Sequence, residues 1–467
     1  MSGPRIRVMA AAFAAVPGSS PHGAAMMSMV DGLRADLDLV TVKTEDLSHI
    51  KRIGEARMFR VPVGTAPRRE QRAIYARAVG RQIRAEPYQV VHVLDPWAGA
   101  AALEPRERGY ALTYEICSFP DPDPGEESLW REAHERTLEA ADRILVSTVA
   151  AARALEGRSL RGRVEVVRPG VDVGAFDWAE VPRFGTPRLL YLGPFSPVRD
   201  LPTMLGAIAK VKTLRPVHAL IAGERDRQRR GEVRDRVQRA GLADVVEVRG
   251  EPNPRSLPGV VAAADVCLAP ARDHRVAGFA ELPQPLLEYM ACYRPVVAAA
   301  VPGVQEVIRD EVEGLLHPPG DAGAMADAIL QALRDAVLRE RITEAGYRRV
   351  RSELNSGARR RRIRQVYEGL VPGSQAHDPW SDDFEDVTGL IELSTSAIEL
   401  LQDDDGGETL APPPHDGPDT SETESPDPRP GEPTHPRRAR LVPPDPPPSP
   451  TDTQPGLVVP DTDPGQR

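Results

Sequence analysis

Short apolar runs alternate with helix-length amphipathic segments over about the first 370 of the 467 residues, and this alternation restricts the fold to an α/β class. Helix-length segments such as 69–85 and 127–141 separate the first apolar runs. Continuous Val, Ile and Leu in such runs is typical of parallel strands that are covered on both faces. We predict strands at 6–13, 37–42, 58–63, 90–94, 112–116, 144–147 and 164–167.

The same alternation begins again at Arg188 after a segment rich in Gly, Asp and Pro at 169–187. We predict strands here at 189–192, 218–222, 245–248, 266–269, 296–299 and 314–316, with helices at 201–212, 231–240 and 286–291. The economical interpretation is two doubly wound domains, residues 1–180 and 186–345, with residues 346–371 as a helix that returns to the first domain. Ligands of such sheets bind outside the carboxyl ends of the strands, so facing domains place the site in the cleft between them.

The charge of the chain is divided unevenly between two segments. Residues 372–467 hold 21 acidic and 5 basic residues, a net charge of −16, whereas residues 1–371 have a net charge of +6. The acidic segment also contains 20 of the 48 prolines, and such a composition does not bury enough apolar surface to offset the entropy of folding. We therefore expect a disordered, Pro-rich tail, in which 386–401 is either a short docking helix or an apolar spacer.

Several classes of protein are excluded by what the sequence lacks. No run approaches 18 apolar residues, so we expect no membrane-spanning helix. Cys117, Cys267 and Cys292 are too few and too scattered for a disulfide framework or a zinc site, which favours a cytoplasmic, reducing compartment. The start of the chain imitates a signal peptide, but we interpret it as the first strand. The acidic motifs at 121–123 and 403–405 are interpreted as solvated acids, so no bound metal is predicted.

The most informative run is ELPQPLLEYMACYRPVVAAAVPGVQEVIRDEVEG, residues 281–314. It places Glu288 at the start of a short helix that is followed by a strand at 295–300. A carboxylate at such a junction can accept hydrogen bonds from two sugar hydroxyls, a geometry that suits a nucleotide ribose. The alternative is a glutamate on a helix surface.

The part PLLEYMACYRPVVAAAVPGVQEVI, together with GLLHPPGDAGAMADAI, resembles the nucleotide-sugar domain of family 4 of the GT-B-fold glycosyltransferases. Three further stretches resemble the family in the expected order: AADRILVSTVAAARAL with VVRPGVDVGAF, RLLYLGPFSPVRDLPTMLGAI, and VVEVRGEPNPRSLPGVVAAADVCLAP. The resemblance covers residues 5–370 and is most specific in the second half. It implies a GT-B fold, with two Rossmann-like domains facing a cleft. It also implies transfer of a hexosyl group from a nucleotide-diphosphate sugar, with retention and without a metal or other cofactor.

The resemblance also implies roles for particular residues. Glu288 matches the family's ribose-binding glutamate, and Arg199 matches the cation that neutralises the leaving diphosphate. The implied catalytic residues are Arg199 and Glu281. The implied donor-binding residues are Gly193, Arg199, Glu224, Gly278, Phe279, Leu282, Gln284 and Glu288. The expected phosphate and acceptor loop comprises Gly18, Ser19, Ser20, His22 and Gly23, with Glu115 facing the acceptor at a strand end.

Three positions depart from the family pattern. Ala280 stands where the first glutamate of E-x7-E is expected, and Glu281 is displaced from it by one residue. Pro194 replaces a phosphate-binding arginine, and Pro283 offers no main-chain N–H. An alternative function is therefore a catalytically impaired GT-B scaffold that binds partners through its acidic tail. A different nucleotide-sugar enzyme, such as an epimerase, is a further alternative.

The basic charge of residues 1–371 indicates anionic partners. Residues 68–84 carry six arginines on a predicted amphipathic helix, which is either a solvated face or a contact with anionic lipid at the inner face of the membrane. The second interpretation suits a lipid-linked acceptor in glycolipid or polysaccharide synthesis. Nucleic acid is not expected as a partner, because no aromatic residues are interleaved with the arginines.

Overall fold

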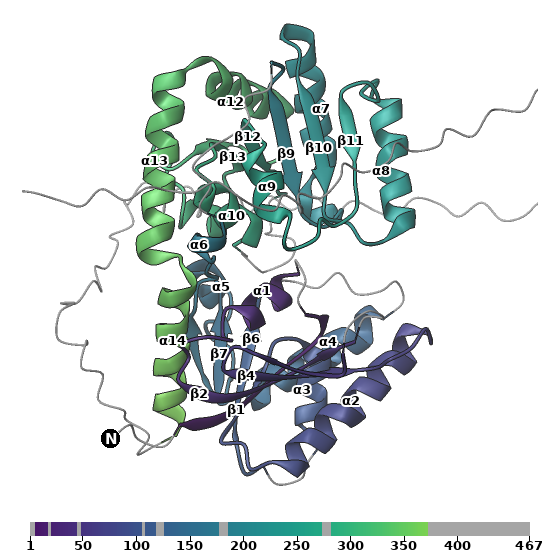
Figure 1. Cartoon of the computed structure of the whole chain (residues 1–467), viewed down its shortest axis with the longest axis vertical. Helices are drawn as coiled ribbons and strands as arrows, with labels where there is room; N and C mark the ends of the chain where they lie inside the picture. The colour runs from purple at the N-terminus through teal and green to yellow at the C-terminus, as the bar shows by residue number, and fades with distance from the viewer. Residues whose placement is uncertain are drawn as a thin grey trace, which may run out of the picture. The chain divides into compact units, whose positions relative to one another are not determined.

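Two sheets organise the part of the chain that the computed structural model describes, which is residues 5–16, 20–43, 48–104, 108–117, 126–176, 185–272 and 282–371 (Figure 1). The predicted tail at 372–467 lies outside these residues. The first sheet has eight strands in the order β3-β4-β2-β1-β5-β6-β7-β8. Their bounds are β1 (Ile6–Ala15), β2 (Ala35–Val42), β3 (Ile50–Ile53), β4 (Ala56–Val61), β5 (Val90–Val93), β6 (Ala111–Ile116), β7 (Arg143–Val146) and β8 (Arg163–Val166).

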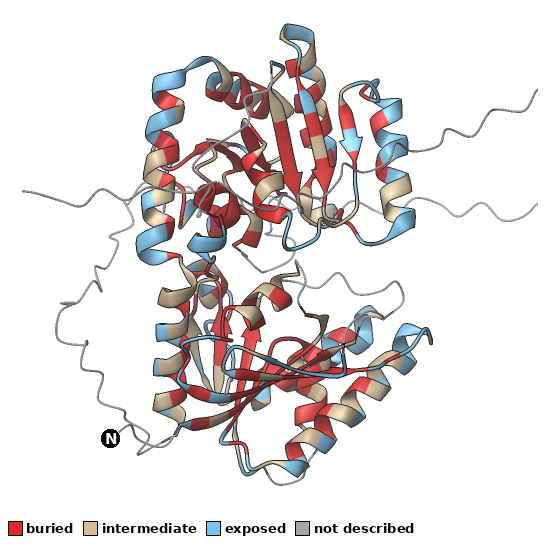
Figure 2. Cartoon of the chain, in the orientation of Figure 1, coloured by how far each residue is buried: buried red, intermediate tan, exposed pale blue. Residues whose placement is uncertain are grey.

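Alternate residues of β1 build the two cores of this sheet, as expected for a strand whose side chains point to opposite faces. The helices of this sheet are α1 (Pro21–Met27), α2 (Arg68–Ala85), α3 (Pro96–Ala102), α4 (Glu127–Ala140) and α5 (Val149–Arg153). Met9 and Ala11 belong to the core that also contains residues of α2 to α5, whereas Val8 and Ala10 belong to the core on the other face. The burial colours of Figure 2 show the continuous buried centre of this sheet.

One strand was not predicted from the sequence. β3 pairs antiparallel with β4, while every other described pair in this sheet is parallel. Three of its four residues are exposed, so it carries no apolar run that would distinguish it from a loop.

The second sheet is parallel throughout its described pairs and has the order β11-β10-β9-β12-β13-β14. Leu189 and Tyr191 of its central strand face one core, and Leu190 and Leu192 face the other. Its strands are β9 (Arg188–Leu192), β10 (His218–Ala222), β11 (Val246–Val248), β12 (Val266–Ala269), β13 (Val296–Ala299) and β14 (Leu315–His317). Its helices are η1 (Pro197–Arg199), α7 (Leu201–Leu214), α8 (Arg227–Arg239), α9 (Leu257–Ala262), α10 (Gln284–Ala291) and α11 (Pro302–Gln305).

Three helices end the described chain: α12 (Ala322–Arg334), α13 (Ala336–Glu353) and α14 (Ser356–Leu370). The last of them packs on the first sheet, where Ile363, Val366 and Tyr367 join the core formed by β1 and α1. The Tyr367 hydroxyl also lies 2.6 Å from Nδ1 of His92 in β5. In the Gly-, Asp- and Pro-rich segment at 169–187, the described residues include the short helix α6 (Val173–Phe176).

Candidate functional site

The turn after β9 is shaped by two glycines that approach each other closely. Gly193 has φ of +149°, and Gly223, which follows β10, has φ of +120°. A Cβ on Gly223 would lie 2.6 Å from the main-chain nitrogen of Gly193, so a side chain cannot be accommodated there. Gly193, the predicted donor-binding residue, has a φ that side chains rarely adopt, and its turn lies at the carboxyl edge of the sheet.

Glu224 supports the same turn through its side chain. One carboxylate oxygen accepts a hydrogen bond from the Phe195 amide at 3.0 Å, and the other accepts from the Asp226 amide at 2.9 Å. The side chain is buried, so these two donors replace the water that it has lost. In the structure Glu224 thus fixes the loop after β9 to the start of α8, and its predicted contact with the donor remains a prediction.

Arg199 occupies a short 3-10 turn, η1, between β9 and α7. Its amide donates to the Ser196 carbonyl at 3.1 Å, and Asp200 follows it with φ of +43°. This left-handed residue ends the turn and lets α7 begin at Leu201. The predicted cation is therefore held on a tight turn at the strand edge where a diphosphate is expected.

Helix α10 connects the predicted ribose ligand to the same edge. Tyr289 accepts a hydrogen bond at its hydroxyl from the Leu192 amide at 2.7 Å, directly before Gly193. The preceding residue, Glu288, lies in the second turn of the helix, because α10 begins at Gln284, two residues before the helix predicted at 286–291. This hydrogen bond fixes Glu288 relative to the glycine turn.

Glu288 is a buried carboxylate with only 8% of its surface exposed. Burial raises the pKa of Glu288 to about 7, and the Gln284 side chain opposes part of this rise. No ion pair to Glu288 is found among the residues that the structure describes. Carboxylates with such shifted pKa values concentrate at functional sites.

Of the other donor-binding residues predicted at 278–284, the structure describes Leu282 and Gln284. Leu282 is buried in the core with residues of α10 and β9, and the side-chain Nε2 of Gln284 donates to the Gly170 carbonyl at 3.4 Å. The predictions for Gly278, Phe279 and Glu281, and the departure at Ala280, lie outside the described residues.

On the first sheet, the expected phosphate loop leads into α1. Ser20 is the N-cap of this helix, and its hydroxyl accepts from the Gly23 amide at 3.1 Å. His22 lies close enough to the buried Asp95 to act on its pKa: burial raises that pKa, and His22 lowers it. The predictions for Gly18 and Ser19 lie outside the described residues.

Asp95 was missed by the sequence reasoning. It follows β5 and caps α3, accepting from the Trp97 and Ala98 amides at 2.8 and 2.9 Å and from the Phe13 amide at 2.5 Å. The signal that the sequence offered was an acidic residue between an apolar strand and a proline.

Glu115 forms a buried ion pair at the end of β6. Both of its oxygens accept from Nη2 of Arg359 in α14, at 2.7 and 2.9 Å, and His92 Nε2 lies 3.1 Å away. Burial alone would raise the pKa of Glu115, but the charge of Arg359 and the bond with His92 outweigh it and lower that pKa to about 2. The carboxylate thus fastens α14 to the first sheet, and an acceptor contact remains a prediction.

A small cavity brings some of the predicted residues together. Glu115 from the first sheet and Leu282 and Gln284 from the second half of the chain line it jointly. The hydroxyl of Ser147 is buried there and has no hydrogen-bond partner among the residues that the structure describes. The complete lining is Pro21, Ala25, Glu115, Cys117, Ser147, Val167, Pro169, Gly170, Leu282, Gln284 and Arg359.

A second contact between the two halves comes from Glu306, whose role the sequence did not reveal. Its carboxylate accepts from the Val149 and Ala150 amides, both at 2.9 Å, at the amino end of α5. Arg168 lies 3.3 Å from the same carboxylate. Negative charge at a helix amino end is favourable, so Glu306 joins the segment after β13 to the segment after β7.

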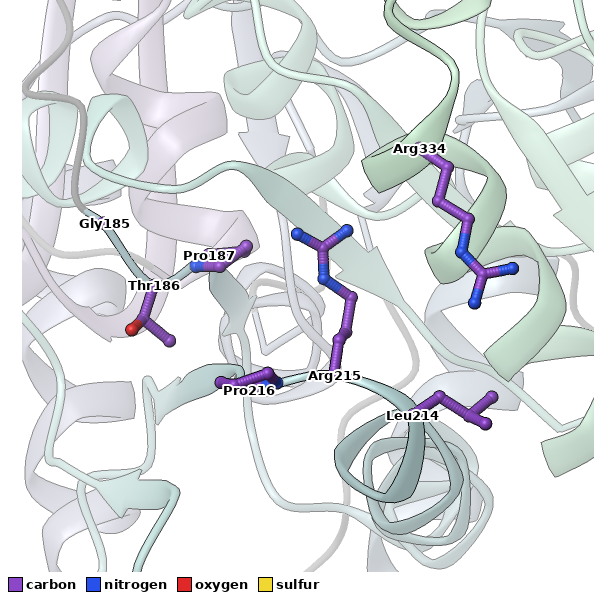
Figure 3. A pocket seen from close by; sticks show the side chains of 7 residues that line it. All are labelled: Gly185, Thr186, Pro187, Leu214, Arg215, Pro216 and Arg334. Carbon is purple, nitrogen blue, oxygen red and sulfur yellow. The ribbon is translucent and has the colours of Figure 1, made fainter.

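A larger hollow of about 350 Å³ lies elsewhere (Figure 3). Its walls come from residues that precede β9 and β10 and from the ends of α7 and α12. These are the amino ends of the strands, opposite to the edge that carries Gly193 and Glu224. The lining residues are Gly185, Thr186, Pro187, Leu214, Arg215, Pro216 and Arg334.

Two comparisons of sequence identify the family. Residues 18–170 match the model described as a glycosyl transferase 4-like domain, and residues 186–335 match that described as glycosyl transferases group 1. The chain is 30% identical over 319 residues to D-inositol 3-phosphate glycosyltransferase of Kribbella flavida, an alignment that covers 59% of this chain and 70% of the relative. The chain belongs to family 4 of the GT-B glycosyltransferases. The resemblance inferred from the sequence motifs is confirmed.

Other family members match over shorter parts. The chain is 31% identical over 227 residues to phosphatidyl-myo-inositol mannosyltransferase of Mycobacterium leprae, which covers 47% of this chain and 56% of that protein. The chain thus spans about half the length of several relatives that it matches.

Solved structures share the GT-B fold. Sucrose-phosphate synthase from Thermosynechococcus elongatus aligns with a TM-score of 0.66 at 22% identity, covering 78% of this chain and 99% of that one. Anabaena HepE in complex with UDP-glucose aligns with a TM-score of 0.58 at 17% identity, covering 78% and 100%. The predicted fold class, two doubly wound α/β domains of the GT-B type, is confirmed.

The described residues also bear on metal binding and on membrane insertion. No group of three or more His, Cys, Asp or Glu side chains with the arrangement of a metal site occurs among them. None of the helices in that part of the chain combines the length and the apolar character that crossing a membrane requires.

Proposed function

We propose that this chain transfers a hexosyl group from a nucleotide-diphosphate sugar to an acceptor hydroxyl, with retention of anomeric configuration and without a metal. Glu288 carries the proposal: a buried carboxylate, with a pKa raised to about 7, tied through Tyr289 to the glycine turn after β9. Burying a carboxylate without a charged partner is unfavourable, and two ribose hydroxyls would add hydrogen-bond donors to the one from Gln284 when the nucleotide binds.

The proposed reaction exchanges one bond at the anomeric carbon for another. The glycosidic bond to the diphosphate breaks and the acceptor oxygen bonds to the same face of the anomeric carbon. A phosphate oxygen of the leaving diphosphate takes the acceptor proton, so we assign no side chain as general base. Arg199 stabilises the charge that grows on the leaving group, an interaction that commonly contributes a few kcal/mol to the transition state.

The acceptor that we propose is a phosphate-bearing or lipid-linked polyol in glycolipid or polysaccharide synthesis. The names of two relatives support this class: one is a phosphatidyl-myo-inositol mannosyltransferase and the other a D-inositol 3-phosphate glycosyltransferase, so each name contains an inositol that carries a phosphate. The basic residues of α2 also suit it: Arg69, Arg77, Arg81 and Arg84 are exposed, whereas the guanidinium of Arg72 lies over the Trp97 ring. Peripheral contact of a cytoplasmic protein with anionic lipid is part of the proposal.

A donor screen tests this function. The purified full chain is incubated with UDP-, GDP- and ADP-sugars, and release of nucleoside diphosphate is measured with and without polyol acceptors. We expect Glu288→Gln and Arg199→Gln to lower kcat/KM about 100-fold to 1,000-fold for the accepted donor. Glu247→Gln, in an exposed ion pair with Arg249, is the matched control and should leave turnover unchanged. Failure to bind any nucleotide sugar, or full activity of both site variants, would refute the proposal.

A further inference from the structure

A second arginine is attached to the turn that carries Arg199. Arg272 follows β12 at the carboxyl edge of the second sheet, and its amide donates to the carbonyl of Val198 at 3.0 Å. Val198 is the central residue of η1 and directly precedes Arg199. Although 73 positions apart in the sequence, the two arginines therefore stand on segments that are hydrogen-bonded to each other.

The side chain of Arg272 is held loosely. Its Nε lies 3.6 Å from Oδ1 of Asp200, and the guanidinium-bearing side chain is 56% exposed. No other hydrogen bond or ion pair of this guanidinium occurs within the described part of the chain. A guanidinium has five N–H donors, so the Asp200 contact leaves most of them available to a ligand.

We propose that Arg272 is a second cation for the donor diphosphate and acts together with Arg199. The inference rests on the proposed function, since it concerns the same donor. A departing nucleoside diphosphate carries more charge than one guanidinium neutralises, and bidentate arginine contacts to phosphate are among the strongest hydrogen bonds in proteins. Asp200 keeps Arg272 beside η1 before the donor arrives. A cation at this position also offsets the loss caused by Pro194.

The structural role of Arg272 has to be separated from a role in binding. Asp200 is buried, with a side chain only 6% exposed, so removing Arg272 changes the surroundings of a carboxylate in a left-handed backbone conformation. Asp200→Asn removes the same ion pair but keeps Arg272, and asparagine tolerates the left-handed conformation well. Both variants, Arg272→Gln and Asp200→Asn, therefore lose the ion pair between these residues, but only Asp200→Asn keeps the positive charge of Arg272.

The experiment measures binding by calorimetry to the full chain. UDP, GDP and ADP are compared, and the nucleoside diphosphate that binds most tightly is used with its parent nucleoside. We expect Arg272→Gln to weaken diphosphate binding about 10-fold to 30-fold and to leave nucleoside binding within twofold. Arg272→Lys should stay within about fivefold of the unaltered chain, because it keeps the charge. Arg236→Gln, an exposed arginine of α8, controls for general electrostatic attraction.

The outcomes distinguish the inference from the function on which it rests. Diphosphate affinity of Asp200→Asn equal to or higher than that of the unaltered chain supports direct contact by Arg272. Equal losses in Asp200→Asn and Arg272→Gln would overturn the inference, because a purely structural role predicts them. Arg272→Gln with unchanged affinity, while Arg199→Gln loses affinity, would overturn the inference and leave the proposed function standing. Absence of nucleoside diphosphate binding by the unaltered chain would overturn both.

Discussion

Two buried glutamates, one on each half of the molecule, have pKa values that are shifted in opposite directions. Glu115, at the end of β6, is 4% exposed, and Glu288, in α10, is 8% exposed. Burial acts against the charged form of both. Nevertheless the pKa of Glu115 is lowered to about 2, whereas that of Glu288 is raised to about 7.

The difference follows from the partners that the fold supplies. Glu115 meets Arg359 and His92 within the protein, and its hydrogen-bonding capacity is used to hold α14. Glu288 has the neutral side chain of Gln284 as its neighbour. A buried carboxylate whose partner is internal stabilises the fold, while one without a charged partner is suited to a ligand that supplies the missing donors.

Breaking the ion pair between Glu115 and Arg359 should have the largest effect on the free energy of unfolding. Glu115→Gln leaves Arg359 charged, buried and without a counter-ion, so we expect the free energy of unfolding at pH 7 to fall by about 3–5 kcal/mol. Chemical denaturation monitored by circular dichroism measures this change. Because the pKa of Glu115 is lowered, its contribution is present above pH 4.5 and is lost as the pH falls toward 2.

The matched comparison for Glu115 is an exposed pair. Glu247 and Arg249 are 57% and 60% exposed, so Glu247→Gln should cost less than about 1 kcal/mol. The double variant Glu115→Gln with Arg359→Met should recover much of the stability, because no charge is then buried. Equal stabilities of Glu115→Gln and Glu247→Gln would refute the structural role.

The same substitution at Glu288 should act in the opposite direction. The folded pKa of about 7 exceeds the ordinary value of 4.5, so the folded state binds more protons between these pH values and stability falls as the pH rises through them. Glutamine removes this cost, and we expect Glu288→Gln to be more stable by about 2–3 kcal/mol at pH 8. Denaturation at pH 5 and pH 8 should show the gain growing with pH. A variant that is less stable at pH 8 would contradict this reading of Glu288.

The sequence predicted the fold better than it predicted the contacts. The apolar runs located every described strand of the second sheet, because continuous Val, Ile and Leu segments are buried on both faces. The exposed strand β3 and the short helices α1, α3 and α5 gave no comparable signal, since the helices contain only five to seven residues.

The roles of side chains that contact residues far away in the sequence could not be predicted from the sequence alone. The acceptor contact expected for Glu115 stays a prediction, while its ion pair with Arg359, 244 positions away, could not be predicted from the sequence. Glu306 similarly caps a helix that begins 157 positions earlier. Glu288, Arg199 and Gly193 were assigned to the donor site from the resemblance to the family, and their contacts with the donor stay predictions. Gly278, Phe279 and Glu281 stay predictions.

The pH dependence of nucleotide binding in the unaltered chain and in Glu288→Gln tests the central claim most directly. Calorimetry with the tightest-binding nucleoside diphosphate gives the ratio of the two dissociation constants at each pH, which cancels the titration of the phosphate itself. At pH 8 the ionised carboxylate should bind the ribose about 100-fold better than glutamine. At pH 5.5 the carboxyl is protonated in the free protein. The ratio of the dissociation constant of Glu288→Gln to that of the unaltered chain should therefore fall about 30-fold, from about 100 to about 3. A ratio that stays constant from pH 8 to pH 5.5 would contradict the claim that the ionised Glu288 carboxylate binds the donor ribose.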